Sequence, residues 1–236
     1  MYDTTNDFSE STDQAEANPD RVKQMTELWW QEAEANDVMP LDDRTLVDII
    51  NFRQPNGLMA LPKVTLYSGQ GHVPQYSMIT ATERSMGITA HFSEALYGQA
   101  DGVLLASGEA NGGYTLYIKN GTLCFEHVYL GRRDITQAFL PKSLETLTVV
   151  IHVADDDSAT VQLFADRKRI GRGNVVEVAN HLSFWGIDVG RDGGSQVSDA
   201  YTAPFEFPKD RLDRIEMTFF EDATAEDIAA LLEATE

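Results

Sequence analysis

The chain has 236 residues, and 38 Asp and Glu against 18 Lys and Arg give it a formal net charge of -20 at pH 7. Hydrophobic residues make up 42% of the chain, which suffices for a sizeable core and excludes a disordered or fibrous protein. The negative charge argues against nucleic acid or an anionic membrane as the main partner, because both would be repelled. A single cysteine, Cys124, excludes an intramolecular disulfide and a cysteine-rich zinc module.

The first part of the chain predicts one helix. Asn18 can cap free amides and Pro19 suits a first helical turn, so a helix is expected over residues 19–35. Four apolar residues then recur on one helical face: Val22, Met25, Trp29 and Ala33. The adjacent Trp29 and Trp30 cannot both occupy the centre of that face, and we expect them to pack in a core. Residues 1–20 have no basic start and no apolar stretch, so they show no secretory signal.

From Lys63 onward, short β-type runs alternate with Gly, Asn and Asp, which is typical of an all-β sandwich. The expected strands are Val64–Tyr67, Gly87–Ser93, Val103–Ser107, Tyr114–Lys119, Thr122–Tyr129, Thr146–Val153, Thr160–Ala165, Ile170–Asn174, Ser183–Val189 and Ile215–Phe220. We therefore predict a mainly β protein, a concanavalin A-like or jelly-roll antiparallel sandwich over residues 63–220. A helical segment with a connector precedes it in 1–62, and a short helix follows in 221–236, where Thr224 precedes apolar residues at helical spacing.

Two turns stand out between the expected strands. Asn120-Gly121 can adopt positive φ at both central positions of a tight hairpin. Asp166-Arg167 occupies a similar place but suits such a turn less well, because Arg rarely adopts positive φ. Both positions predict antiparallel neighbours.

The residues that could carry chemistry give weak signals. The five histidines are scattered without metal-ligand spacing: His72, His91, His127, His152 and His181. Cys124 alternates with Phe125 and His127 along a strand, which predicts a buried, inert thiol on the opposite face. The glycine-rich run 108–113 lacks a following Lys-Ser/Thr for phosphate, and the acids 155–157 lack the alternate spacing of a calcium loop. We expect turns at both places.

The segment 188–201 is the strongest candidate for a ligand site. It combines three acids with three glycines and two serines, and glycines allow backbone carbonyls to turn inward. A hard cation or a sugar could bind such a rim, whose expected members are Asp188, Arg191, Asp192, Ser195 and Asp199. The alternative is a long ordered loop that caps the sandwich, with Arg191 paired to a nearby acid.

Several motifs, taken together, resemble the C-terminal region of bacterial arylsulfatases, in which a sulfatase domain is followed by a concanavalin-like sandwich. The end of the sulfatase domain is matched by Tyr2-Asp3, Asp7-Phe8-Ser9-Glu10, Leu28 to Glu34 and Pro40 to Arg44. The sandwich is matched by Ile88-Thr89-Ala90, Gly102 to Ala106, Gly112 to Tyr117 and Asp188 to Ser198. The chain departs from the family at Asp166-Arg167, where Asp-Gly is usual, and at Ser85-Met86-Gly87, where Ser-His-Thr is usual.

The resemblance implies a fragment without a catalytic centre. Sulfatases use a formylglycine in a Cys/Ser-x-Pro-x-Arg motif beside calcium or magnesium, yet neither Cys nor Ser stands two residues before any of the eight prolines. No catalytic, cofactor-binding or metal-binding residue can therefore be assigned, and no cofactor is expected in this chain. The expected partner is the missing sulfatase catalytic domain, contacted through Trp29, Trp30 and Phe52. The family would place the protein in a bacterial cytoplasm or periplasm.

Three functions follow as hypotheses. The first is a non-catalytic accessory sandwich of an arylsulfatase-like sulfuric ester hydrolase, in which unpartnered faces favour homo-oligomers and sulfate esters or glycans are possible ligands. The alternative is a free-standing, lectin-like glycan-binding sandwich. The third is a hydrolase with acids from separate strands, although the Glu-x-Asp-x-x-Glu pattern of sandwich glycoside hydrolases is absent.

Overall fold

A computed structural model describes residues 1–39, 41, 61–75, 84–97, 100–178, 185–220 and 224–233. The chain divides into two compact units, residues 1–53 and residues 54–236. Within the described residues, no helix is both long enough and apolar enough to cross a membrane.

The first unit contains helix α1 (Pro19–Ala35), which has the predicted bounds. Asn18 stands at its N-terminus, but the Asn18 side chain makes no capping hydrogen bond. The rings of Trp29 and Trp30 meet edge to face, 4.8 Å apart, and the residues are 43% and 52% exposed. The expected core packing of both tryptophans is therefore wrong, because Ala33 is the only residue of α1 that becomes buried. Phe52 lies outside the described residues.

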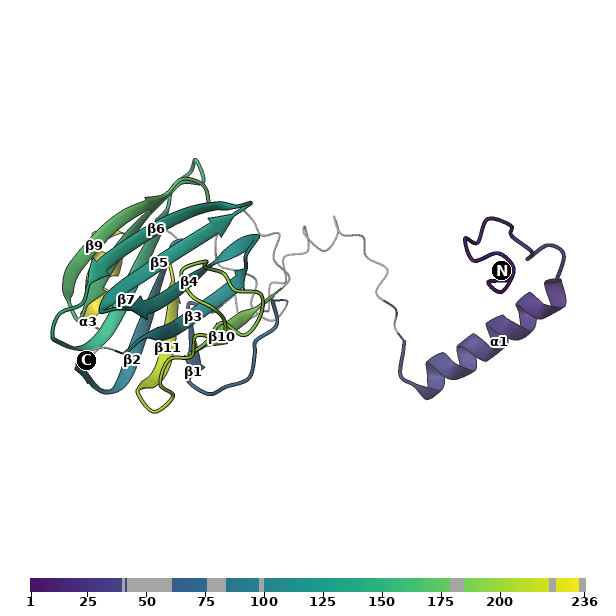
Figure 1. Cartoon of the computed structure of the whole chain (residues 1–236), viewed down its shortest axis with the longest axis horizontal. Coiled ribbons are helices and arrows are strands. Elements are labelled where there is room, and N and C mark those ends of the chain that lie inside the picture. Colours follow the sequence, from purple (N-terminus) through teal and green to yellow (C-terminus); the bar gives the residue numbers. More distant parts are fainter. Residues whose placement is uncertain are drawn as a thin grey trace. The chain divides into compact units, whose positions relative to one another are not determined.

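The second unit is an antiparallel sandwich of two sheets, which confirms the predicted mainly β, jelly-roll-like fold (Figure 1). Its described strands are β1 (Lys63–Tyr67), β2 (Met86–Tyr97), β3 (Gly102–Glu109), β4 (Gly112–Lys119), β5 (Thr122–Tyr129), β6 (Arg132–Phe139), β7 (Ser143–Val153), β8 (Ala159–Ala165), β9 (Lys168–Val175), β10 (Ile187–Val189) and β11 (Leu212–Phe219). The six-stranded sheet has the order β1-β11-β2-β7-β8-β9, and the five-stranded sheet has the order β10-β3-β4-β5-β6.

The alternation of side chains along β5 shows how the core forms. Leu123 and Phe125 point between the two sheets and join the main apolar core. Cys124 and Val128 point to the outer face of the five-stranded sheet, as the sequence predicted for the thiol. Burial raises the pKa of the Cys124 thiol, which favours its protonated, unreactive form.

Strand β6 was not predicted, because its burial runs against its hydrophobic pattern. Ile135 is exposed on this strand, whereas Thr136 is buried. Thr136 faces Gly173 of β9, where a Cβ would lie only 2.1 Å from the Thr136 hydroxyl oxygen. A glycine on the opposing strand thus creates room for a polar residue that periodicity places in solvent.

The predicted turns join these strands. Asn120 and Gly121 both have positive φ, 52° and 71°, between β4 and β5. Leu130 and Gly131 have the same pattern, 47° and 81°, between β5 and β6, although Leu is an unusual residue there. Asp166 has φ 53° in the turn between β8 and β9, so the Asp, rather than Arg167, takes the left-handed conformation.

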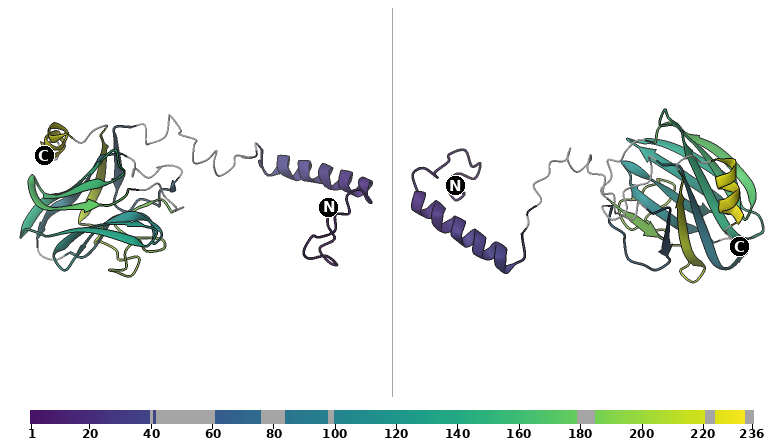
Figure 2. Two further views of the ribbon diagram at one scale, coloured as in Figure 1. Left: turned by 90° about the horizontal axis from the view of Figure 1, so that it is seen from above. Right: turned by 180° about the vertical axis from the view of Figure 1, so that it is seen from behind.

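Each sheet has a cover on its outer face. Residues 190–205, called here the covering loop, lie over the five-stranded sheet, in front of β3 and β4 in Figure 1. Helix α3 (Ala225–Glu233) lies over the six-stranded sheet, as both views in Figure 2 show. Its Leu231 and Leu232 pack with Val150 and Phe164. The structure thus has a main core between the sheets and a smaller apolar cluster under each cover.

Candidate functional site

The covering loop is fixed to the sheet by a buried polar network. Arg133 on β6 donates to Glu126 Oε1 on β5 at 2.7 Å and to the Val197 carbonyl at 2.8 Å, and it pairs with Asp199 at 2.9 Å. The Ser198 hydroxyl donates to Glu126 Oε2 at 2.5 Å. Glu126 is almost fully buried, so these partners replace the water that its carboxylate loses. The network connects two strands to the loop in one geometry.

A second group of hydrogen bonds fixes the middle of the loop. Asp192 Oδ2 accepts from the Val197 amide at 2.8 Å and from the Tyr201 hydroxyl at 2.6 Å. The Tyr201 oxygen also lies 3.1 Å from Thr115 Oγ1 on β4. Burial raises the pKa of Asp192, while the hydrogen bonds from Tyr201 and Val197 oppose that shift. Asp192 is therefore an internal anchor of the loop.

A buried carboxylate at the start of the loop gathers three partly exposed side chains. Asp188 on β10 is 2% exposed, and its Oδ2 accepts from Trp185 Nε1 at 2.9 Å and from the Gly193 amide at 3.3 Å. His72 Nδ1 lies 3.3 Å from the same oxygen, and Arg191 Nε lies 3.6 Å from Oδ1. The rings of His72 and Trp185 are 4.5 Å apart. We call these four residues the Asp188 cluster.

Two glycines let the loop approach this cluster. A Cβ at Gly193 would lie 2.9 Å from Asp188 Oδ2, and a Cβ at Gly194 would lie 2.6 Å from Trp185 Cε2. Any larger residue would push the loop away from the carboxylate or the indole ring. Gly193 and Gly194 therefore allow close packing of the loop, whereas the sequence analysis expected the glycines to let backbone carbonyls turn inward.

The structure separates the five residues of the predicted rim. Asp188 and Asp192 are buried and directed to protein donors, whereas Arg191 is 39% exposed at its side chain and Ser195 is exposed. Asp199 is exposed and paired with Arg133. The structure thus shows the capping loop that the sequence left open as the alternative, with Arg191 beside an acid. The sequence missed His72 and Trp185, although Trp185 stands only three residues before Asp188.

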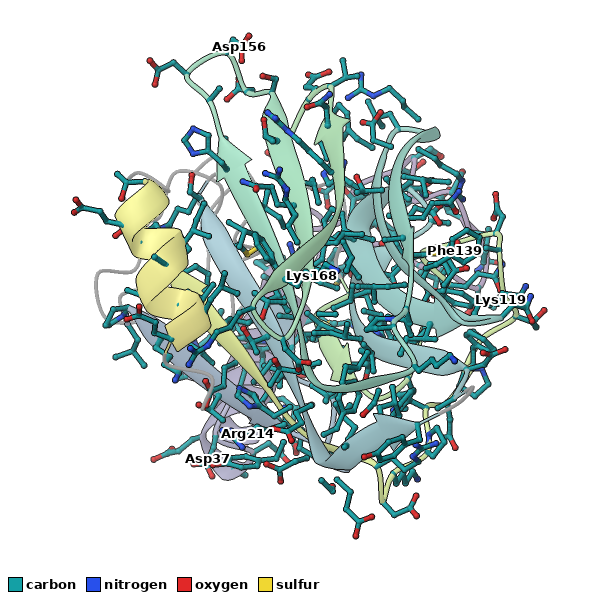
Figure 3. All side chains as sticks on the ribbon, turned by 90° about the vertical axis from the view of Figure 1, so that its left-hand side faces the viewer. Asp37, Lys119, Phe139, Asp156, Lys168 and Arg214 are labelled. Carbon is teal, nitrogen blue, oxygen red and sulfur yellow. The ribbon has the colours of Figure 1, made fainter. Side chains whose placement is uncertain are left out.

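The other expected features carry no site of their own. Residues 108–113 lie at the β3–β4 hairpin, and residues 155–157 form an exposed turn between β7 and β8, with Asp156 at its tip in Figure 3. Among the described residues, no group of three or more His, Cys, Asp or Glu side chains could hold a metal ion. His181 lies outside the described part of the chain.

Comparison with known proteins shows no family for this chain. No protein-family model matches the chain, and no curated protein matches it. One similar solved structure is the carbohydrate-binding module CBM40 of the Ruminococcus gnavus IT-sialidase, bound to α2,3-sialyllactose: TM-score 0.48, 14% identity, covering 75% of this chain and 97% of that chain. Botulinum neurotoxin type C, whose cell entry depends on two ganglioside molecules, has a TM-score of 0.42 and 14% identity, covering 74% and 43%. Mouse laminin α1 domains LG4-5 have a TM-score of 0.37 and 16% identity, covering 67% and 42%.

These comparisons correct the resemblance to arylsulfatases. The structural neighbours are carbohydrate-binding modules and toxin receptor-binding domains, not sulfatase C-terminal regions. The assignment to sulfuric ester hydrolases is therefore wrong, and a sulfatase catalytic domain as partner has no support. The matching motifs have a simpler origin: Gly112 to Tyr117 is a strand after a tight turn, and Asp188 to Ser198 is a strand end with a closely packed loop.

Proposed function

We propose that this sandwich is a lectin-like glycan-binding module and that a glycan contacts the exposed parts of the Asp188 cluster. One observation carries the proposal. A buried carboxylate holds the Trp185 ring by a hydrogen bond and lies beside an imidazole and a guanidinium at a partly exposed position.

The chemistry of these side chains suits a sugar. A sugar offers apolar C–H surfaces together with hydroxyl groups that donate and accept hydrogen bonds. Trp185, which is 37% exposed, supplies apolar aromatic surface, and Arg191 supplies N–H donors in a fixed plane. His72 adds a ring that donates or accepts according to its tautomer. The exposed Ser195 hydroxyl on the same loop is a further possible donor.

The rigidity of the surroundings supports the same proposal. Polar groups that are already held in place lose little conformational entropy when a ligand binds. Asp188 holds Trp185 directly, and the covering loop that carries Arg191 is fixed through Glu126, Arg133 and Asp192. A binding module needs this preformed geometry and needs no nucleophile.

The test is glycan binding by the purified full chain. A glycan array identifies a sugar, and titration calorimetry with that sugar gives the affinity. Arg191→Gln keeps the side-chain length but removes the guanidinium, so affinity is expected to fall about tenfold, equivalent to ~1.4 kcal/mol. Trp185→Phe, which keeps an aromatic ring but loses the N–H to Asp188, should also weaken binding.

Matched variants of the same residue types control for general effects. Arg211→Gln and Tyr97→Ala change an arginine and an exposed tyrosine that contact each other through the Tyr97 carbonyl and do not belong to the Asp188 cluster. Both should bind with unchanged affinity. The proposal is wrong if the array shows no bound glycan, or if Arg191→Gln and Arg211→Gln have equal affinities.

A further inference from the structure

The hairpin formed by β8 and β9 carries a concentration of positive charge in an acidic protein. Four of the 18 Lys and Arg residues fall within six positions: Arg167, Lys168, Arg169 and Arg172. All four are exposed. The one adjacent acid, Asp166, uses Oδ1 to accept from the Glu145 and Thr146 amides at 2.8 and 3.0 Å. We call these four cations the basic hairpin.

The strand geometry arranges two of these cations on one face. A register shift between Leu163 and Phe164 places Arg169 opposite Phe164, while Arg172 lies opposite Gln162. Partners in an antiparallel pair share a face, so both arginines lie on the outer side of the six-stranded sheet. Arg169 also donates to Gln162 Oε1 at 3.3 Å, which holds its guanidinium over the neighbouring strand.

Within the part of the chain that the structure describes, several cations pair with acids, whereas three neighbouring cations of the basic hairpin do not. Lys63 pairs with Glu216, Arg133 with Glu126, and Arg214 with Asp213 and Glu216. Among the described residues, Lys168, Arg169 and Arg172 have no carboxylate within 4.0 Å. A protein with 38 acids thus leaves three neighbouring cations available to an external anion. Figure 3 looks onto this side of the sandwich, where Lys168 lies near the centre and Arg214 lies well apart from it.

We propose that the basic hairpin is a second binding site, which takes a linear polysaccharide bearing sulfate or carboxylate groups. It goes beyond the Asp188 cluster and does not depend on it. Strand β9 is the last strand of the six-stranded sheet and lies beside β6, whereas β10 is at the other edge of the five-stranded sheet. The two sites therefore lie at opposite edges of the sandwich.

The dimensions and the charge favour a single sugar chain. Arg169 and Arg172 are three residues apart on strand β9, about 10 Å of extended chain, a short row that matches one extended polymer. A nucleic acid duplex is wider and more densely charged, and would bring phosphates close to the acidic surroundings.

Cations on an edge strand also have a structural role in many proteins, because they prevent edge-to-edge pairing with another sheet. That role predicts aggregation when the charges are removed and no affinity for polyanions in the native chain. The binding role predicts the opposite pair of results, so the two are separable.

The experiment uses the full chain and four probes at about 0.15 M salt: dextran sulfate, polygalacturonate, uncharged dextran and duplex DNA. We expect binding to dextran sulfate or polygalacturonate, with the two probes distinguishing sulfate from carboxylate, and no binding to dextran. The variant K168Q/R169Q/R172Q should lose at least about tenfold in affinity, and the dependence of log affinity on log salt should flatten by roughly one unit for each cation removed.

The control variant R21Q/K23Q/K209Q removes the same charge from other surfaces and should keep the affinity within about twofold. The charge-preserving variant R169K/R172K should retain most of the binding, even if the neutral variant is poorly folded. The proposal is overturned if neither anionic polysaccharide binds, or if both triple variants lose affinity equally. It is also overturned if duplex DNA binds more tightly with the same dependence on the hairpin. Binding to neutral sugars alone would overturn this site and leave the Asp188 cluster standing.

Discussion

The two outer faces of the sandwich are covered by different kinds of contact. The covering loop is held on the five-stranded sheet by hydrogen bonds and an ion pair that involve Glu126, Arg133 and Ser198. Helix α3 is held on the six-stranded sheet by Leu231 and Leu232. Directional contacts between buried polar groups fix one arrangement, whereas apolar contacts tolerate small shifts.

The polar contacts show which side chains this fold holds in fixed positions. The loop with the polar contacts is the one that carries Arg191 and approaches Trp185. Side chains that bind a ligand need support from neighbours with fixed geometry. We therefore infer that the polar network serves positioning, while α3 serves to keep apolar surface out of water.

Removing the Glu126 side chain should cause the largest loss of stability, because its carboxylate is at the centre of the polar network. Glu126→Ala leaves Arg133 in the loop network with Asp199 as its remaining acid, so the free energy of unfolding should fall by about 4 kcal/mol. Urea denaturation followed by tryptophan fluorescence measures the loss. Glu94→Ala, an exposed glutamate on β2, is the control and should change stability by less than about 0.5 kcal/mol. Equal effects of the two variants would contradict the structural role of the network.

His127, buried between the two sheets, should make the stability of the sandwich depend on pH. Burial lowers the pKa of His127 from 6.5 to about 4, Asp134 opposes the shift and Arg132 adds to it. His127 also lies opposite Tyr114 on β4. As pH falls below 6.5 the unfolded chain takes up a proton that the folded chain does not, so stability falls by about 3 kcal/mol and levels off near pH 4.

The measurement for His127 is the free energy of unfolding at a series of pH values. His127→Leu cannot titrate, so its curve should lack this loss between pH 6.5 and 4, while carboxylates affect both proteins equally. Parallel curves for the two proteins would mean that His127 takes up its proton in the folded state at an ordinary pH.

Shortening Leu231 should release the apolar cover without disturbing the polar one. Leu231→Ala should lower stability by about 2 kcal/mol, at the low end for a core leucine because α3 lies at the surface. Hydrogen exchange should show faster exchange in α3 and unchanged protection in the covering loop. Faster exchange in both covers would indicate that they are coupled.

Removing one hydroxyl should have the smallest effect. Tyr201→Phe keeps the ring stacked on Phe205, 5.2 Å away, but removes the donor to Asp192. A stability loss of about 1 kcal/mol is expected, because the Val197 amide still donates to Asp192. Thermal unfolding measures this loss. Tyr201→Phe should also lower any glycan affinity at the Asp188 cluster more than Leu231→Ala lowers it.

Much of the fold could be predicted from the sequence because its strands alternate clearly. The strands around Asn120-Gly121 were placed within a few residues, since apolar and polar side chains alternate and the turn residues suit a tight hairpin. Strand β6 was missed because Gly173 of β9 makes room for Thr136, and such a contact between distant strands leaves no local signal. The prediction of core packing for Trp29 and Trp30 was wrong although the local signal was clear. Their helix forms as predicted, but the described part of their unit does not bury them.

The ligand site on the covering loop stays a prediction, and its side-chain geometry could not be derived from the sequence. Glycines and acids indicate the loop, but the burial of Asp188 and Asp192 depends on partners that only the fold brings near. His72 is far from Asp188 along the chain and reaches it because Val73 pairs with Ile187 of β10. Pairing between distant segments of this kind is fixed by the whole sheet, so no local pattern could indicate it.

The position of Cys124 gives the protein a built-in reporter. The only cysteine of the chain lies in the apolar cluster under the covering loop, beside Val197 and Tyr201. Its thiol has a raised pKa and is shielded, so a thiol reagent can react with it only when the loop lifts. The alkylation rate of Cys124 in the unmodified protein thus measures how often this loop opens, and a ligand that holds the loop on the sheet would lower that rate.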